Sequence, residues 1–143
     1  MSKTIVLTLV TMLAVPASDA PIAHAGPQGT VTVRASESLE KHLTNGGMSG
    51  KGHFTISGAI SDKGPVTDYR TQKANIAVVR RVAVGAKGTI TFLITINVNT
   101  ASETWTIASG TKAYKGLHGK GKQVLDAWYS SPARFVMTGT VSQ

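Results

Sequence analysis

The sequence predicts an all-β protein, folded as a single eight-stranded antiparallel β-barrel with little helix. Three observations predict it: apolar and polar residues alternate in several segments, short turn-forming connections separate these segments, and glycine is abundant, with 15 among 143 residues. Alternation with a period of two is typical of a half-buried strand, and strands joined in sequence order favour an antiparallel meander. The length allows one core. The absence of cysteine excludes a disulfide scaffold, a thiolate zinc site and a cysteine nucleophile.

The first 25 residues are expected to be a signal peptide, and residues 26–143 the barrel domain. Lys3 gives a positive start, an apolar run follows as far as Val15, and a stretch of small residues ends in Ala-His-Ala at Ala25. This order is typical of an export signal, and the apolar run is shorter than the ~20 residues that span a bilayer. We therefore expect cleavage after Ala25, secretion, and no membrane-spanning segment in the mature protein.

Two strands are expected between the leader and residue 65. Residues 30–34 read TVTVR, which is an alternating strand pattern. Residues 36–43 are expected to form one or two helical turns, and the glycine-rich residues 44–52 a loop. Residues 53–61 place an apolar residue or a glycine at every second position, as in a half-buried strand. Residues 62–65, with the sequence DKGP, predict a turn.

The middle of the chain predicts three further strands. Residues 66–72 and 75–84 follow one another closely, and the GAKG stretch at residues 85–88 predicts a tight hairpin. Residues 89–99 form the strand after this hairpin, because every second residue along most of their length is a bulky apolar one.

The last three strands complete the expected set of eight. A turn at residues 100–103 leads into residues 104–109. Residues 120–129 and 133–141 are the last two strands, joined across the SSP stretch at residues 130–132. Eight strands of this kind could form a barrel or a sandwich. Several of them are nine to eleven residues long, which suits tilted barrel staves, and closure of a barrel removes exposed edges. We therefore favour the barrel.

The most distinctive motif connects two of the late strands, from Trp105 to Gly121, with the sequence WTIASGTKAYKGLHGKG. It resembles the GTGxYxGxxGxG connection of the allene oxide cyclase-like and dirigent-like β-barrel superfamily, most of all in its small bacterial secreted members. Lys112 stands where that family usually has glycine. Residues 52–64 and 135–139 also look like that family. The resemblance implies an eight-stranded antiparallel barrel and a homo-oligomer, since related barrels are often dimers or trimers. No catalytic residue is carried over from it.

The glycines of this motif allow sharp turns, and Tyr114 lies between them. Glycine adopts a positive φ at low cost, so the backbone can leave the sheet at Gly110 and return after Gly116. Tyr114 is expected to fold back as a plug, with its ring packed and its hydroxyl bonded to a partner. The loop is either purely structural or contributes Tyr114 to a ligand site.

The inward-facing side chains decide what a barrel of this size could hold. The apolar alternation of residues 75–84 includes Arg80 and leaves Arg81 on the other face, an order that a β-bulge would reverse. A buried arginine needs a carboxylate partner, which Asp126 or Asp68 could supply. Arg80 and Asp126 are therefore candidates for fixing or polarising a substrate; alternatively these charges face solvent and the aromatic side chains fill the core. The candidate ligand-binding residues are Tyr69, Arg80, Trp105, Tyr114, Asp126 and Trp128.

The net charge of +8 suggests a separate hypothesis. Lys112, Lys115, Lys120 and Lys122 fall in one short stretch without an acid, and a rim of this kind at one barrel mouth would attract anions. It could equally be a solvated face. Nucleic acid is not expected as a partner, because no helix-turn-helix or RNP-type motif is present and aromatic residues do not alternate with the basic ones.

No cofactor or metal is expected. The GLHGKGK stretch beginning at Gly116 lacks the Ser or Thr of a phosphate-binding loop and precedes a strand instead of a helix. The sequence therefore predicts a secreted barrel that binds a small apolar or amphipathic molecule in its lumen. The alternatives are a cofactor-free cyclase or isomerase, and a protein that binds anionic envelope polymers through its basic surface.

Overall fold

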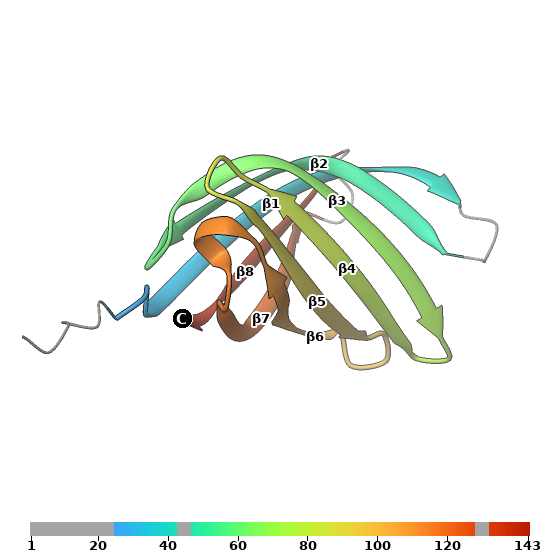
Figure 1. Ribbon diagram of the computed structural model, residues 1–143. Helices are drawn as coiled ribbons and strands as arrows, with labels where there is room; N and C mark the ends of the chain where they lie inside the picture. Colours follow the sequence, from blue (N-terminus) through green and yellow to red (C-terminus); the bar gives the residue numbers. More distant parts are fainter. Residues whose placement is uncertain (1–24, 43–46, 128–131) are drawn as a thin grey trace, which may run out of the picture.

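The computed structural model describes residues 25–42, 47–127 and 132–143, and these form an all-β closed barrel (Figure 1). A single 3₁₀ turn, η1 (Lys112–Tyr114), interrupts the strands. Within these ranges no helix is long and apolar enough to cross a membrane. The strands are β1 (Gly29–His42), β2 (Met48–Gly58), β3 (Asp62–Lys73), β4 (Ile76–Val84), β5 (Thr89–Asn97), β6 (Ser102–Gly110), β7 (His118–Ala127) and β8 (Ala133–Ser142).

The strand order confirms the predicted antiparallel meander. Each strand pairs with the next one in the chain, and β1 also pairs with β8, which closes the barrel. Closure leaves no edge strand open to pairing with another chain. The narrowest seam lies between β6 and β7, where only the three residues from Thr104 to Thr106 pair with β7.

Three element predictions were wrong near the start of the domain. Residues 36–42 are not helical, because β1 continues to His42 and pairs with β2 along this stretch. β8 pairs with β1 as far as Glu37, so Ser36 lies opposite both His53 and Arg134. Residues 48–52 belong to β2, although they were expected in a glycine-rich loop. A Cβ atom at Gly52 would clash with the Ser36 carbonyl, so glycine is required there by the close approach of β1. Residues 62–65, expected as a turn, already pair with β2 as the start of β3.

One end of the barrel is closed by the connection between β6 and β7. In Figure 1, η1 lies at the end opposite the connections from β3 to β4 and from β5 to β6. Tyr114 is 3% exposed, and its hydroxyl donates a 2.7 Å hydrogen bond to Oδ2 of Asp62. Leu117 is buried beside it in the core. The prediction that Tyr114 folds back as a plug is therefore confirmed, and we call this the plugged end.

The plug fixes the charge of Asp62. Burial would raise the pKa of Asp62, but hydrogen bonds from Tyr114 and from the backbone amides of Lys87, Lys63 and Ala86 outweigh it and hold that pKa below its usual value. Burial, together with the negative charge of Asp62, raises the pKa of the Tyr114 hydroxyl. The turns that close this end are thus tied together by one carboxylate.

The apolar core fills the half of the barrel next to the plug. The rings of Phe92 and Trp105 meet edge to face at 5.7 Å. The indole N–H of Trp105 is satisfied by the backbone carbonyls of Lys122 and Thr138, at 3.1 and 3.2 Å. A fully buried Trp usually finds a partner for this donor. The polar side chains of the interior lie toward the other end.

Candidate functional site

The lumen holds a cavity of about 320 Å³, and all eight strands contribute to its wall. A second hollow of about 620 Å³ shares part of this wall and continues to the exposed side chains of Val98 and Val124. The cavity therefore opens at the end opposite the plug, which we call the open end. The cavity is lined by Glu37, Met48, Gly50, Asp68, Arg70, Val79, Arg81, Ile96, Glu103, Gln123, Leu125, Ala133 and Phe135.

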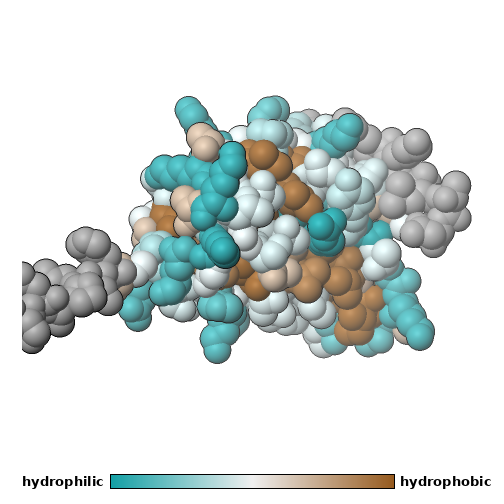
Figure 2. All heavy atoms as spheres, in the orientation of Figure 1, coloured by the Kyte–Doolittle hydropathy of each residue, from teal (hydrophilic) through white to brown (hydrophobic). Residues whose placement is uncertain are grey.

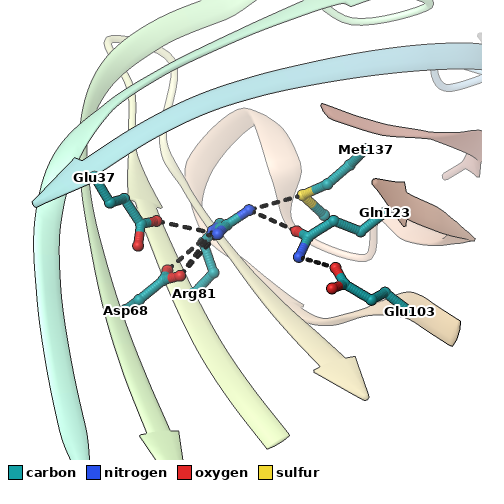
Figure 3. A network of polar contacts seen from close by, with 6 residues as sticks. All are labelled: Glu37, Asp68, Arg81, Glu103, Gln123 and Met137. Carbon is teal, nitrogen blue, oxygen red and sulfur yellow. Dashed lines mark hydrogen bonds and ion pairs between the residues drawn. The ribbon is translucent and has the colours of Figure 1, made fainter. Parts of the chain in front are cut away.

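Arg81 of β4 is the centre of a polar network across the lumen (Figure 3). It is 1% exposed. Its Nε and Nη2 atoms donate to the two oxygens of Asp68 on the neighbouring strand β3, at 2.9 and 2.7 Å. This two-point contact is the strongest geometry for a guanidinium and a carboxylate. Burial alone would lower the pKa of Arg81, but Asp68 and Glu37 outweigh it, so Arg81 remains charged.

The other side of the Arg81 guanidinium reaches across the barrel. Nη1 donates to Oε1 of Gln123 at 2.9 Å and to the sulfur of Met137 at 3.2 Å. The side-chain amide of Gln123 in turn donates a 2.7 Å hydrogen bond to Oε2 of Glu103. The guanidinium carbon lies 4.9 Å from the ring centre of Phe135, within range of a cation–π contact. All three nitrogens of Arg81 are thus engaged by side chains of the protein.

Glu37 of β1 faces the same guanidinium and is the least satisfied group of the network. Its Oε1 lies 3.1 Å from Nη2 of Arg81, and its side chain is 3% exposed. The N–H bonds of Nη2 are not directed at this oxygen, so Oε1 accepts no hydrogen bond within the described residues. Desolvation raises the pKa of Glu37 to about 8, with Asp68 adding to the rise and Arg81 opposing it. Two carboxylates share one guanidinium, so Glu37 holds a proton at neutral pH.

Charges are segregated between the inside and the outside of this barrel. Among the described residues, Glu37, Asp68 and Glu103 line the cavity and Asp62 holds the plug. The side chains of Glu40 in β1 and Asp126 in β7 lie outside the described part of the structure; among the side chains that are described, no acid lies on the outer faces of β1, β2, β7 and β8. Those faces instead carry a set of exposed cationic side chains and a histidine that we call the outer basic wall: Arg34, Lys51, His53, Lys120, Lys122 and Arg134.

Arg80 does not face the lumen, so the prediction that placed it there is wrong. Arg80 is exposed, and the inward positions of β4 are Ala77, Val79, Arg81 and Ala83. The alternation misplaced Arg80 because apolar residues occupy both faces of β4, so it could not show which face points inward. Its bulkier residues Ile76 and Val78 lie outside, where Figure 2 shows apolar side chains over β4 and β5, and smaller ones lie inside beside the large guanidinium.

The other residues that were predicted to face the lumen lie in different parts of the barrel. Tyr69 is 42% exposed and points outward, so its placement in the lumen is wrong; in β3 the inward positions are those of Val66 and Asp68. Trp105 is interior, as predicted, but it packs in the core and does not line the cavity. Tyr114 belongs to the plug.

Asp126 and Trp128 cannot be placed as site residues. Asp126 falls at the register shift of β7, and its side chain lies outside the described part of the structure. Trp128 also lies outside the described residues. The buried arginine does pair with Asp68, one of the two carboxylates considered, but that arginine is Arg81 and not the predicted Arg80.

The sequence reasoning missed Glu37, Glu103 and Gln123. Glu37 lay in a segment expected to be helical, yet it continues the alternation of Val31, Val33 and Ala35, all buried. That alternation was the signal that could have placed Glu37 in the lumen.

The predicted lysine rim is not a ring around the open end. All four lysines are exposed. Lys112 and Lys115 flank η1 at the plugged end, where Figure 2 shows many hydrophilic side chains, whereas Lys120 and Lys122 belong to the outer basic wall. Lys112 has a φ of 53°, the left-handed conformation that glycine adopts most easily.

The described residues contain no cluster of three or more metal-ligating side chains. The chain matches no family model and no curated protein. The resemblance to allene oxide cyclase-like and dirigent-like barrels therefore stays a prediction, and the function must be argued from the lumen itself.

Proposed function

We propose that this protein binds a small amphipathic molecule in the lumen of its barrel. The observation that carries the proposal is the cavity of about 320 Å³, open at one end and lined by Glu37, whose buried Oε1 faces Arg81 but accepts no hydrogen bond within the described residues. Ligand pockets begin at roughly 300 Å³ and combine an apolar lining with a few polar groups. The polar end of the ligand would meet Glu37, and its apolar body would lie against Val79, Ile96 and Phe135.

A pair of variants on one strand tests this proposal. Val79→Phe adds bulk inside the cavity, and Val78→Phe makes the same change at the adjacent, outward-facing residue. Binding of octan-1-ol, followed by NMR titration, should weaken by at least about tenfold in Val79→Phe, because the apolar contact volume is lost. Val78→Phe should bind as the native protein does.

The controls for this test are direct. Ile96→Phe, at the mouth of the cavity, provides a second blocking variant should Val79→Phe unfold the barrel. Equal binding by the native protein and both blocked variants, or no binding by the native protein, would overturn the proposal. Recovery of a chemically rearranged ligand would instead support the cofactor-free cyclase or isomerase, with Glu37 as the proton donor.

The charge segregation supports a second candidate, binding of anionic envelope polymers by the outer basic wall. Phosphate-rich polymers bind clustered cations in a salt-dependent way. Replacing Lys120, Lys122 and Arg134 by Ala should weaken binding of poly(glycerol phosphate) and reduce the slope of affinity against salt concentration. Val79→Phe should leave both quantities unchanged. The opposite pattern would exclude this candidate.

We also propose export of the mature protein, supported by the order of charged, apolar and small residues in the first 25 positions. Terminal sequencing of protein recovered from the medium should begin at Gly26. Retention of the intact amino terminus would overturn this proposal.

A further inference from the structure

We propose that the ligand of the lumen carries a positively charged nitrogen at its polar end, so that the cavity selects amphipathic cations over neutral molecules and anions. This inference rests on the proposed lumen binding and deepens it by naming the chemical class of the ligand. It follows from which groups of the network are already satisfied and which are not.

The buried guanidinium offers an anionic ligand at most one free N–H. Nε and one N–H of Nη2 donate to Asp68, Nη1 donates to Gln123 and Met137, and the second N–H of Nη2 lies beside Glu37. An anion that needs a second donor would have to displace one of these contacts and leave a buried carboxylate or amide unpaired, which is costly. Glu37 lies beside the same guanidinium and would repel the anion when it is ionised.

The unsatisfied groups of the cavity are acceptors. Glu37 lines the cavity, and its buried Oε1, which forms an ion pair with Arg81, accepts no hydrogen bond within the described residues. Asp68 and Glu103 add two more carboxylates to the wall, against Arg81 at the base and the half-buried Arg70 nearer the mouth. Arg70 donates one of its five N–H groups to Gln72 and, being partly exposed, remains in contact with solvent. A donor with a positive charge is therefore the group that completes the site.

The wall favours an organic cation over a metal ion. The part of the chain that the structure describes has no group of three ligating side chains that could hold a metal. The surroundings of the carboxylates are instead apolar, with Val79, Leu125 and Phe135 on the wall. An alkylammonium ion satisfies both requirements, because its nitrogen pairs with Glu37 and its hydrocarbon chain covers the apolar lining.

Binding of such a cation is coupled to the proton on Glu37. The charged groups facing Glu37 are Arg81 from β4 and Asp68 from β3, with Glu103 from β6 farther along the network. The other strands place no charged side chain on the described cavity wall. Because the cation and the proton compete for one carboxylate, the affinity for a cation of fixed charge rises with pH as Glu37 loses its proton.

Three probes with the same chain and different head groups test the inference: octylammonium, octan-1-ol and octanoate. Their affinities are measured by calorimetry at about pH 6.5 and pH 9, and NMR shifts of the Val79 and Ile96 methyl groups show whether each probe occupies the lumen. The native protein should bind the ammonium probe at least about tenfold more tightly than the alcohol at the higher pH, which corresponds to one charge-assisted contact. Its affinity should fall by at least about tenfold at the lower pH.

The matched variant is Glu37→Gln, which keeps the shape of the side chain and removes its charge. In this variant the preference for ammonium over alcohol and its pH dependence should both disappear, while octan-1-ol still binds and reports an intact cavity. Tighter binding of octanoate, or an ammonium preference that survives in Glu37→Gln, would overturn the inference and leave lumen binding standing. Absence of all three probes from the lumen would instead overturn the proposed function.

Discussion

Replacing Glu37 by Gln changes how the stability of the barrel depends on pH. In the folded protein, desolvation raises the pKa of Glu37 from 4.5 to about 8. Between these values the folded state holds a proton that the unfolded chain releases. The contribution of Glu37 to stability is therefore complete below the unfolded pKa and is lost as pH rises through the folded one. Gln has no proton to lose, so the variant lacks this decline.

The size of the effect follows from the two pKa values. Each unit of pKa difference corresponds to ~1.4 kcal/mol, so the free energy of unfolding should fall by at most ~5 kcal/mol, from this group, between pH 4.5 and about pH 8. Asp62 acts in the opposite direction, since its lowered pKa gives stability that is lost as pH falls. Asp62 is present in both proteins, so its contribution cancels in the difference between them.

Urea unfolding followed by far-UV circular dichroism, at several pH values from about 5 to 9, measures this difference. The stability of Glu37→Gln relative to the native protein should rise steadily over this range and level off above about pH 8. Glu103→Gln, at the half-buried end of the same network, controls for the general effect of removing a negative charge. Parallel stability curves for the native protein and Glu37→Gln would refute the assignment of a buried, protonated Glu37.

Four further substitutions test the plug and the two faces of β4. Tyr114→Phe should lower stability by about 1 kcal/mol in urea unfolding, because Asp62 loses a hydrogen-bond donor, and an unchanged midpoint would exclude this bond as a stabilising contact. Lys112→Gly should raise stability by up to about 1 kcal/mol, since it relieves a left-handed conformation in a non-glycine residue; a loss would contradict this. Arg81→Met should cost about 3–5 kcal/mol by leaving buried carboxylates unpaired, whereas Arg80→Met should change stability by less than about 0.5 kcal/mol. Equal effects at the two arginines would mean that the faces of β4 are wrongly assigned.

The barrel could be predicted from the sequence because the pattern that specifies it is repeated along the whole chain. Period-two alternation and short connections fix the strand order without any long-range information. It is harder to predict which face of an individual strand points into the barrel. In β4, apolar residues occupy both faces, so hydrophobicity alone could not choose between Arg80 and Arg81. Only the packing of neighbouring strands decides which face is buried.

The sequence predicted that a buried arginine would pair with a carboxylate, but it did not identify Arg81 and Glu37 as residues of the site. A buried arginine needs a carboxylate, and Asp68 supplies it. Glu37 was not predicted to lie in a strand, because the small polar residues on the outer face of this segment have low β-propensity. Pairing with β2 holds residues 36–42 in the sheet, and β8 pairs with Ser36 and Glu37 on the other side. Such pairing between distant segments overrides local propensity and cannot be predicted from the segment alone.

The most direct test of lumen binding is a set of NMR contacts between octylammonium and the methyl groups of the labelled protein. The methylene group next to the nitrogen should show contacts near Glu37, and the rest of the alkyl chain should show contacts with the inward-facing Val79 and Ile96. The outward-facing Val78 and Leu93 serve as internal controls and should show none. Contacts confined to Val78 and Leu93 would place the ligand on the outside of the barrel and contradict binding in the lumen.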